Sequence, residues 1–188
     1  MKTEKINLRF GIIVLMIMAA AFSRIIPHPL NFAPIGAMAI FGAAYFSNRI
    51  LAFAIPIFSL WLSDLVLNNT VYASYNEHIW LFPTGFPWIW LAFILITLSG
   101  IFLLKTVKIG TVTGASLSAS AIFFLVSNYV CWPGNPMYTQ DLSGLVTCYI
   151  AGIPFFWNTL AGDLFYSAVL FAGFELAKKK FPKLAIAH

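Results

Sequence analysis

The chain has 188 residues, of which 61% are hydrophobic and only 9% are charged, and its formal net charge is +5. Soluble domains are about 45–50% apolar and about 25% charged, so a soluble fold of this length could not cover so much apolar surface. We therefore expect an all-α integral membrane protein with one transmembrane domain, residues 1–188, whose solvent is the lipid bilayer. The cations stand at the ends of apolar runs rather than on one face, which argues against nucleic acid as a partner.

Six apolar runs are candidates for membrane-spanning helices, because about 20 apolar residues cross a ~30 Å bilayer core. Pro27 and Pro29 end the first run, since proline disfavours helix in the residue before it. The second run is short and rich in Gly and Ala, so it is either a full span or a tilted helix buried among its neighbours. We predict one bundle with spans at about 8–26, 33–47, 50–67, 85–104, 109–129 and 153–177.

The first run imitates a secretory signal peptide, because a basic start precedes an apolar stretch and three alanines. We expect it to be retained as a helix, because the apolar stretch continues through Ile25 and Ile26. Retention also gives an even number of spans, which fits two basic chain ends on the same side.

The positions of Lys and Arg predict how the bundle lies in the membrane. Cytoplasmic loops retain these cations, because positive charge resists translocation. Ten of the eleven cations fall on one side of the predicted spans, and Arg24 is the exception. Both termini are therefore expected in the cytoplasm. The ten are Lys2, Lys5, Arg9, Arg49, Lys105, Lys108, Lys178, Lys179, Lys180 and Lys183.

Two further segments, 68–84 and 130–152, are expected on the outer side. Residues 138–152 read as a short interfacial helix before the last span. Small residues recur at four-residue spacing along the fifth span, as in Gly114 and Ser118 or Ser116 and Ser120. This spacing lets helix backbones approach closely, either within one bundle or against a partner helix.

Ionisable groups at membrane depth mark candidate functional sites. Arg24, Asp64 and Asn128 end outward-running spans, while Asn158 and Asp163 lie near the outer start of the last span. These five can converge beneath the outer surface, rimmed by His28 and Asn31 and walled by Trp132 and Tyr166, as in a concave small-molecule site. The predicted substrate-binding residues are Arg24, His28, Asn31, Asp64, Asn128, Trp132, Asn158, Asp163 and Tyr166.

Arg24 has three interpretations at this stage. An arginine keeps its charge, so it needs an anion at this depth. It can pair with Asp64 or Asp163, extend to the outer headgroups, or bind a carboxylate or phosphate of a ligand.

Enzyme signatures and cofactor motifs are weak in this sequence. The chain has no HExxH motif, no Gly-rich phosphate loop and no ordered Ser, His and Asp set. Ser127 or Cys131 could act as a nucleophile only with a base such as His28 or His78 nearby. The two cysteines, Cys131 and Cys148, lack metal-ligand spacing. We therefore expect no catalysis, no cofactor and no metal.

Several segments resemble a family of small, uncharacterised bacterial membrane proteins of a transport type, DUF6580. That resemblance covers most of the chain and implies a multi-pass protein of the bacterial cytoplasmic (inner) membrane. It rests on residues 23–29, 31–37, 63–64, 123–128 with Trp132, 144–149 and 153–163.

The architecture is also similar to the substrate-binding S components of energy-coupling-factor (ECF) vitamin transporters, which have six helices and an outer ligand pocket. This similarity implies a substrate-binding protein for uptake of a small nutrient or vitamin-like molecule. It further implies a transmembrane coupling subunit with ATPase subunits as partners. The alternative is a structural or assembly subunit of a membrane complex, with no small-molecule ligand, in which small-residue faces of the second and fifth spans meet a partner.

Overall fold

The computed structural model of the protein describes residues 8–75, 79, 81–82 and 85–185, and within them every regular element is helical. Lys2, Lys5 and His78 lie outside the described residues. The α-helices are α1 (Leu8–Phe22), α2 (Ile35–Tyr45), α3 (Arg49–Asn69), α4 (Phe86–Leu103), α5 (Ile109–Cys131) and α6 (Leu142–Lys180). Short 3₁₀ helices are η1 (Ser23–Ile25), η2 (Ala73–Tyr75) and η3 (Pro182–Leu184).

Five helices, α1 with η1, α3, α4, α5 and α6, are long and apolar enough to cross a membrane. This confirms the prediction of an all-helical, multi-pass membrane protein. The second predicted span is different, because α2 has only 11 residues and is about 16 Å long at the helical rise of 1.5 Å. It is therefore too short to cross a ~30 Å core by itself.

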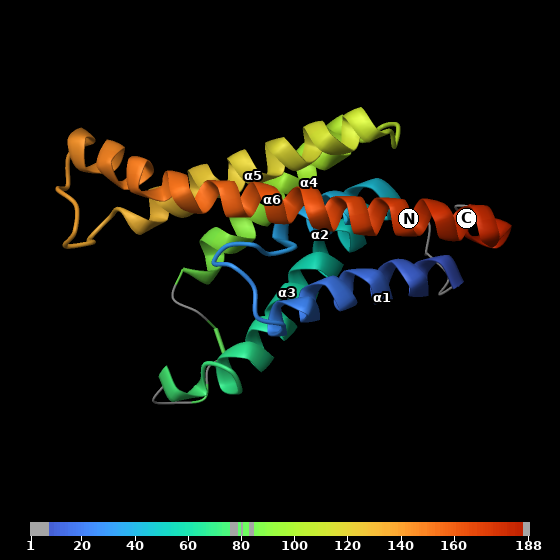
Figure 1. Ribbon diagram of the computed structural model, residues 1–188, viewed down its shortest axis with the longest axis horizontal. Coiled ribbons are helices and arrows are strands. Elements are labelled where there is room, and N and C mark those ends of the chain that lie inside the picture. The colour runs from blue at the N-terminus through green and yellow to red at the C-terminus, as the bar shows by residue number, and fades with distance from the viewer. Residues whose placement is uncertain (1–7, 76–78, 80, 83–84, 186–188) are drawn as a thin grey trace.

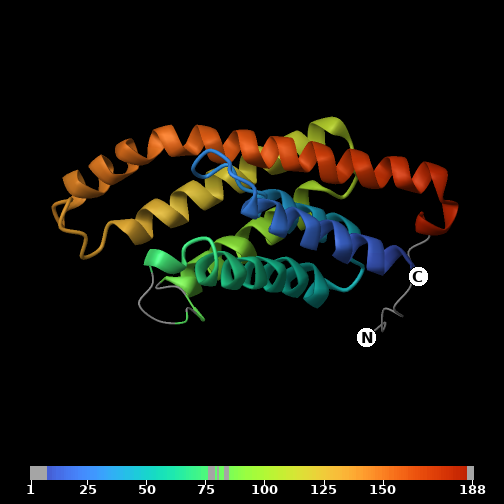
Figure 2. The same cartoon turned by 60° about the horizontal axis from the view of Figure 1, so that its bottom comes forward.

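The short helix α2 forms the centre of the bundle. Nine of its 11 residues are buried, and it contacts α1, α3, α4, α5 and α6. Small side chains allow this close packing: a Cβ at Gly100 of α4 would lie 2.9 Å from the Cβ of Ala43. The second apolar run is therefore a helix buried among its neighbours and not a full span. Figures 1 and 2 show α2 enclosed by the longer helices.

The last helix corrects the prediction of a separate interfacial helix over 138–152. The structure has one continuous helix, α6, of 39 residues, with Pro154 inside it. Asp141 caps its first turn by accepting a hydrogen bond of 2.8 Å from the Gly144 N–H. The first turns pack against α5, where the Tyr149 hydroxyl donates to the Leu125 carbonyl at 2.8 Å. Because this helix–helix contact supports residues 142–152, they continue the span.

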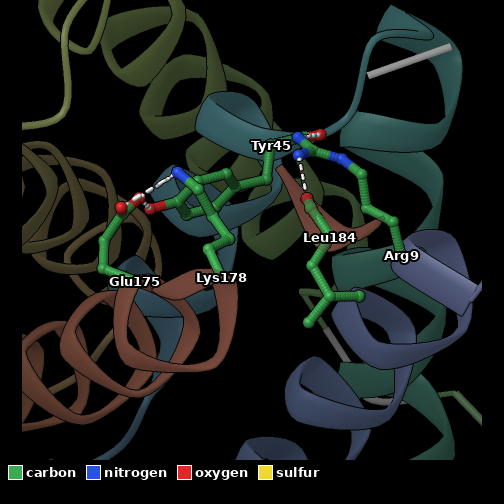
Figure 3. A network of polar contacts seen from close by, with 5 residues as sticks. All are labelled: Arg9, Tyr45, Glu175, Lys178 and Leu184. Carbon is green, nitrogen blue, oxygen red and sulfur yellow. Dashed lines mark hydrogen bonds and ion pairs between the residues drawn. The ribbon is translucent and has the colours of Figure 1, made fainter. Parts of the chain in front are cut away.

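A network of polar contacts fastens one end of the bundle (Figure 3). The Arg9 guanidinium donates to the carbonyls of Leu184, at 2.8 Å, and Tyr45, at 3.1 Å. The Tyr45 hydroxyl donates to Glu175 Oε1 at 2.5 Å, and Lys178 donates to the same oxygen at 2.7 Å. The start of α1, the end of α2, the end of α6 and η3 therefore meet at one end, which we call the basic end.

Candidate functional site

The connection between η1 and α2, residues 26–34, turns back into the bundle and contacts α6. Asn31 lies in the left-handed region with φ of 64°, a conformation that asparagine tolerates better than most residues. The Asn158 side chain donates to the Leu30 carbonyl at 2.9 Å. Gly162 provides room for the passing backbone, since a Cβ there would lie 2.9 Å from the Ala33 nitrogen.

Aromatic contacts hold the same connection. The Phe32 ring lies 5.7 Å from the Phe165 ring and 5.8 Å from the Tyr166 ring, measured between centroids. The Ser23 hydroxyl donates to the Tyr166 hydroxyl oxygen at 2.9 Å. Asn158 and Tyr166 therefore position the connection on α6.

Asp163 is a buried carboxylate at the N-terminus of α2, with only 1% of its surface exposed. Its Oδ1 accepts from the Ala37 backbone N–H at 3.1 Å, and its Oδ2 accepts from the Ser120 hydroxyl at 2.7 Å. A Cβ on Gly36 would lie 2.5 Å from Oδ2, so only glycine leaves room for the carboxylate. A negative charge here is favourable, because a helix N-terminus carries positive partial charge.

Arg24 forms an ion pair with Asp64, as in the first of the three interpretations of Arg24 that the sequence allows. The guanidinium Nη1 lies 2.5 Å from Asp64 Oδ1 and donates to the Ser63 hydroxyl at 3.0 Å. The side chains of Arg24 and Asp64 are 17% and 11% exposed, so water screens the pair weakly. This contact ties η1 to α3.

Four of the predicted residues, Arg24, His28, Asn31 and Asp163, line one cavity of about 450 Å³, which we call the outer cavity because it lies away from the basic end. The connection 26–34 supplies much of its wall, and Leu67, Tyr72, Phe123 and Thr159 complete it from α3, α5 and α6 and the segment after α3. His28 is exposed, and its Nδ1 lies 2.6 Å from the Ile26 carbonyl. The outer cavity thus combines charged, polar and apolar walls.

A second cavity of about 490 Å³ adjoins the first, because both are lined by Asn31, Phe123 and Thr159. It lies between the end of α5 and the first half of α6. Asn128 lines it, and the Asn128 amide donates to the Phe124 carbonyl at 2.8 Å. Cys131 and Cys148 line it as well.

Trp132, the remaining predicted site residue, lines neither of these two cavities. Its indole N–H donates to the Thr139 carbonyl at 2.8 Å within the α5–α6 loop. The same loop holds Asp141, whose pKa is lowered below its ordinary value by hydrogen bonds from the Gly144 N–H and the Thr139 hydroxyl. Trp132 therefore belongs to the loop and cap of α6.

The comparisons with known proteins give one result. Residues 4–184 match the family of unknown function DUF6580. The chain belongs to this family. No curated protein and no solved structure matches the chain. The predicted membership of DUF6580 is thereby confirmed, and the segments 23–29, 31–37 and 153–163 all contribute lining residues to the outer cavity of this DUF6580 protein.

Three partners of the charged residues were not among the predicted site residues: Ser63, Ser120 and the Ala37 N–H. The four-residue spacing of Ser116 and Ser120 was a usable signal, because it places both hydroxyls on one helix face. The backbone donor gave no signal, because it depends on where α2 begins. In the part of the chain that the structure describes, no three His, Cys, Asp or Glu side chains gather to hold a metal.

Proposed function

We propose that this protein binds a small polar nutrient of vitamin-like size in the outer cavity for uptake across the bacterial cytoplasmic membrane. In this proposal the basic end faces the cytoplasm, with both termini there. The observation that carries the proposal is the outer cavity itself, which places Arg24 and Asp163 in one space of about 450 Å³. Small-molecule sites typically have volumes of about 300–1,000 Å³.

The depth of these two charged residues supports the proposal. Arg24 follows Arg9 by 15 residues, and Asp163 precedes Lys178 by 15 residues. At the helical rise, each lies about 22 Å from the basic end. In a ~30 Å core both would lie in the outer third, where charged groups are costly and usually serve a pathway or a site.

The chemistry of the walls suggests what the ligand offers. His28 and the Asn31 amide provide hydrogen-bond donors and acceptors at the cavity, while Leu67, Tyr72 and Phe123 provide apolar contact. A small molecule with a ring or short carbon skeleton and several polar groups suits this combination. The Arg24–Asp64 pair would polarise the rim and favour a ligand with an acidic group near Arg24.

The test is mass spectrometry of small molecules that co-purify with the detergent-solubilised protein. We expect one compound enriched with the wild-type protein and lost from a variant carrying His28→Ala and Asn31→Gly. Glycine retains the left-handed backbone at residue 31 while removing the amide. Trp132→Phe is the control, because Trp132 lines neither cavity, and it should retain the compound. Equal retention in all three proteins would reject the outer cavity as the site.

A second candidate function is a structural subunit without a ligand. One observation favours it: Arg24 pairs with Asp64, and Asp163 accepts hydrogen bonds from Ala37 and Ser120, so the buried charges already have internal partners. Small-residue faces would then meet a partner, but α2 is enclosed, which leaves α5. A stoichiometric partner protein without any enriched small molecule would favour this function.

The energy source is the remaining part of the proposal. In this proposal the protein would deliver its ligand as ECF S components do, through a transmembrane coupling subunit with ATPase subunits. Purification from the native membrane in a mild detergent tests this point. Recovery of an ATPase together with a second membrane subunit would support it, whereas recovery of the protein alone with its ligand would favour an independent carrier.

A further inference from the structure

A groove of about 580 Å³ runs between α5 and α6 on the basic half of the bundle, apart from the outer cavity. It extends along α6 from Leu164 to Lys179, which is about 22 Å at the helical rise. Figures 1 and 2 show the second half of α6 running past the start of α5. Both helices are long enough to cross a membrane, so the groove lies at the depth of the lipid chains.

The walls of the groove are apolar and shaped by small side chains. Ala168 and Ala172 of α6 are exposed within it, and Val112 and Phe171 form apolar surface beside them. At its floor the Ser116 hydroxyl donates to the Ser167 hydroxyl at 2.9 Å, so these buried polar atoms satisfy each other. The groove therefore fits a hydrocarbon chain.

The end of the groove at the basic end carries cations. Lys108 at the start of α5 and Lys179 near the end of α6 both line it and are exposed. Glu175 also lines the groove, but Lys178 and the Tyr45 hydroxyl hold its carboxylate. Among the residues that the structure describes, the unmatched charge at this end of the groove is thus positive.

We propose that this groove is a binding site for one anionic phospholipid. An acyl chain lies along α5 and α6, and the phosphate group contacts Lys108 and Lys179. Basic pockets between transmembrane helices on the cytoplasmic side bind acidic lipid headgroups for the same electrostatic reason. The apolar wall selects a lipid over a free anion, and the two lysines select an acidic headgroup over a zwitterionic one.

The test is native mass spectrometry of the full chain in detergent with phosphatidylglycerol or phosphatidylcholine added. The charge variant carries Lys108→Gln and Lys179→Gln, and the control carries Lys105→Gln and Lys180→Gln. Both variants lose two exposed cations from the same end, but the control residues do not line the groove. We expect the charge variant to bind phosphatidylglycerol about thirty-fold more weakly, from the attraction of two lysines near a surface, and the control to be unchanged.

A second pair of variants tests the groove itself without changing charge. Ala172→Leu fills the groove and should reduce lipid adducts, whereas Ala161→Leu, also exposed on α6 but outside the groove, should retain them. Equal losses in the two charge variants, or full lipid binding by Ala172→Leu, would overturn the proposal. Equal binding of the two lipids would also overturn it. So would the finding that Ala172→Leu displaces a bound partner helix and no lipid. The thermal stability of each variant shows that it is folded.

Discussion

Asp163 should act as a structural cap for α2, and the sharpest test compares two substitutions that remove its charge. Asp163→Ala removes both acceptor oxygens and leaves the Ala37 N–H buried without an acceptor. The Ser120 hydroxyl loses Asp163 but keeps the Ser116 carbonyl as an acceptor at 3.1 Å. A buried donor left unsatisfied costs about 1–3 kcal/mol. Hydrogen bonds between helices in membranes average about 0.6 and reach about 1.7 kcal/mol. We therefore expect Asp163→Ala to lower the free energy of unfolding by about 1–3 kcal/mol.

Asp163→Asn is the matched variant, because its amide oxygen can still accept from the Ala37 N–H and its amide nitrogen can donate to Ser120. It loses only the charge at the helix N-terminus, which is worth about 0.3–2 kcal/mol. Reversible unfolding in mixed micelles, monitored by circular dichroism, measures both variants against the wild type. If Asp163→Asn destabilises the protein as much as Asp163→Ala, charge dominates over hydrogen bonding. If neither variant changes stability, Asp163 is not a cap.

Three other predictions address the ion pair, the close packing of α5 on α6 and the cap of α6. Arg24→Met and Asp64→Asn should each lower the free energy of unfolding by about 1–3 kcal/mol, because each leaves the other residue of the pair weakly solvated and without its partner. The double variant should cost less than the sum of the two. Additive effects in this double-mutant cycle would contradict the pairing. Gly152→Ala should destabilise the protein by about 1–3 kcal/mol through overpacking, since the added Cβ would overlap a side-chain amide of α5. Gly114→Ala is the control and should leave stability unchanged, because nothing lies within 4 Å of its Cβ. The lowered pKa of Asp141 means that its cap is fully effective above the ordinary pKa of 3.8 and is lost as the pH falls through the lowered value. The protection of the first α6 amides, measured as their hydrogen-exchange rate relative to the intrinsic rate at each pH, should therefore fall in acid for the wild type but show no such pH dependence in Asp141→Asn.

Much of the fold could be predicted from the sequence, because a lipid bilayer permits few backbone conformations. Backbone groups in a bilayer must be satisfied internally, so long apolar runs form helices. The predicted spans 50–67, 85–104 and 109–129 match α3, α4 and α5 closely at their starts. The length of α6 was not predicted, because residues 138–152 were assigned to a separate interfacial helix and the last span was begun at residue 153. Packing on α5 instead sustains one helix through this region.

The candidate site was predictable in part. Charge at depth identified Arg24 and Asp163, and the structure places both at the outer cavity. Asn128 and Trp132 were grouped with them because spans were treated as parallel rods ending at one level. The α5–α6 pair instead carries Asn128 into the adjoining cavity and Trp132 into a loop. Lateral position depends on tilt and rotation of the helices, which hydropathy does not encode.

The outer cavity follows from a helix that is too short to cross the membrane. A helix of about 16 Å that ends at the basic end must begin inside a ~30 Å core, where its first N–H groups need acceptors from the protein. Asp163 supplies an acceptor from α6, and Gly36 leaves the space for it. The chain must then reach this buried start through an irregular segment, residues 26–34, which lipid tolerates only where protein or a cavity surrounds it. The same segment that feeds α2 therefore forms the cavity wall, so a longer α2 would remove the polar site together with the need for its cap.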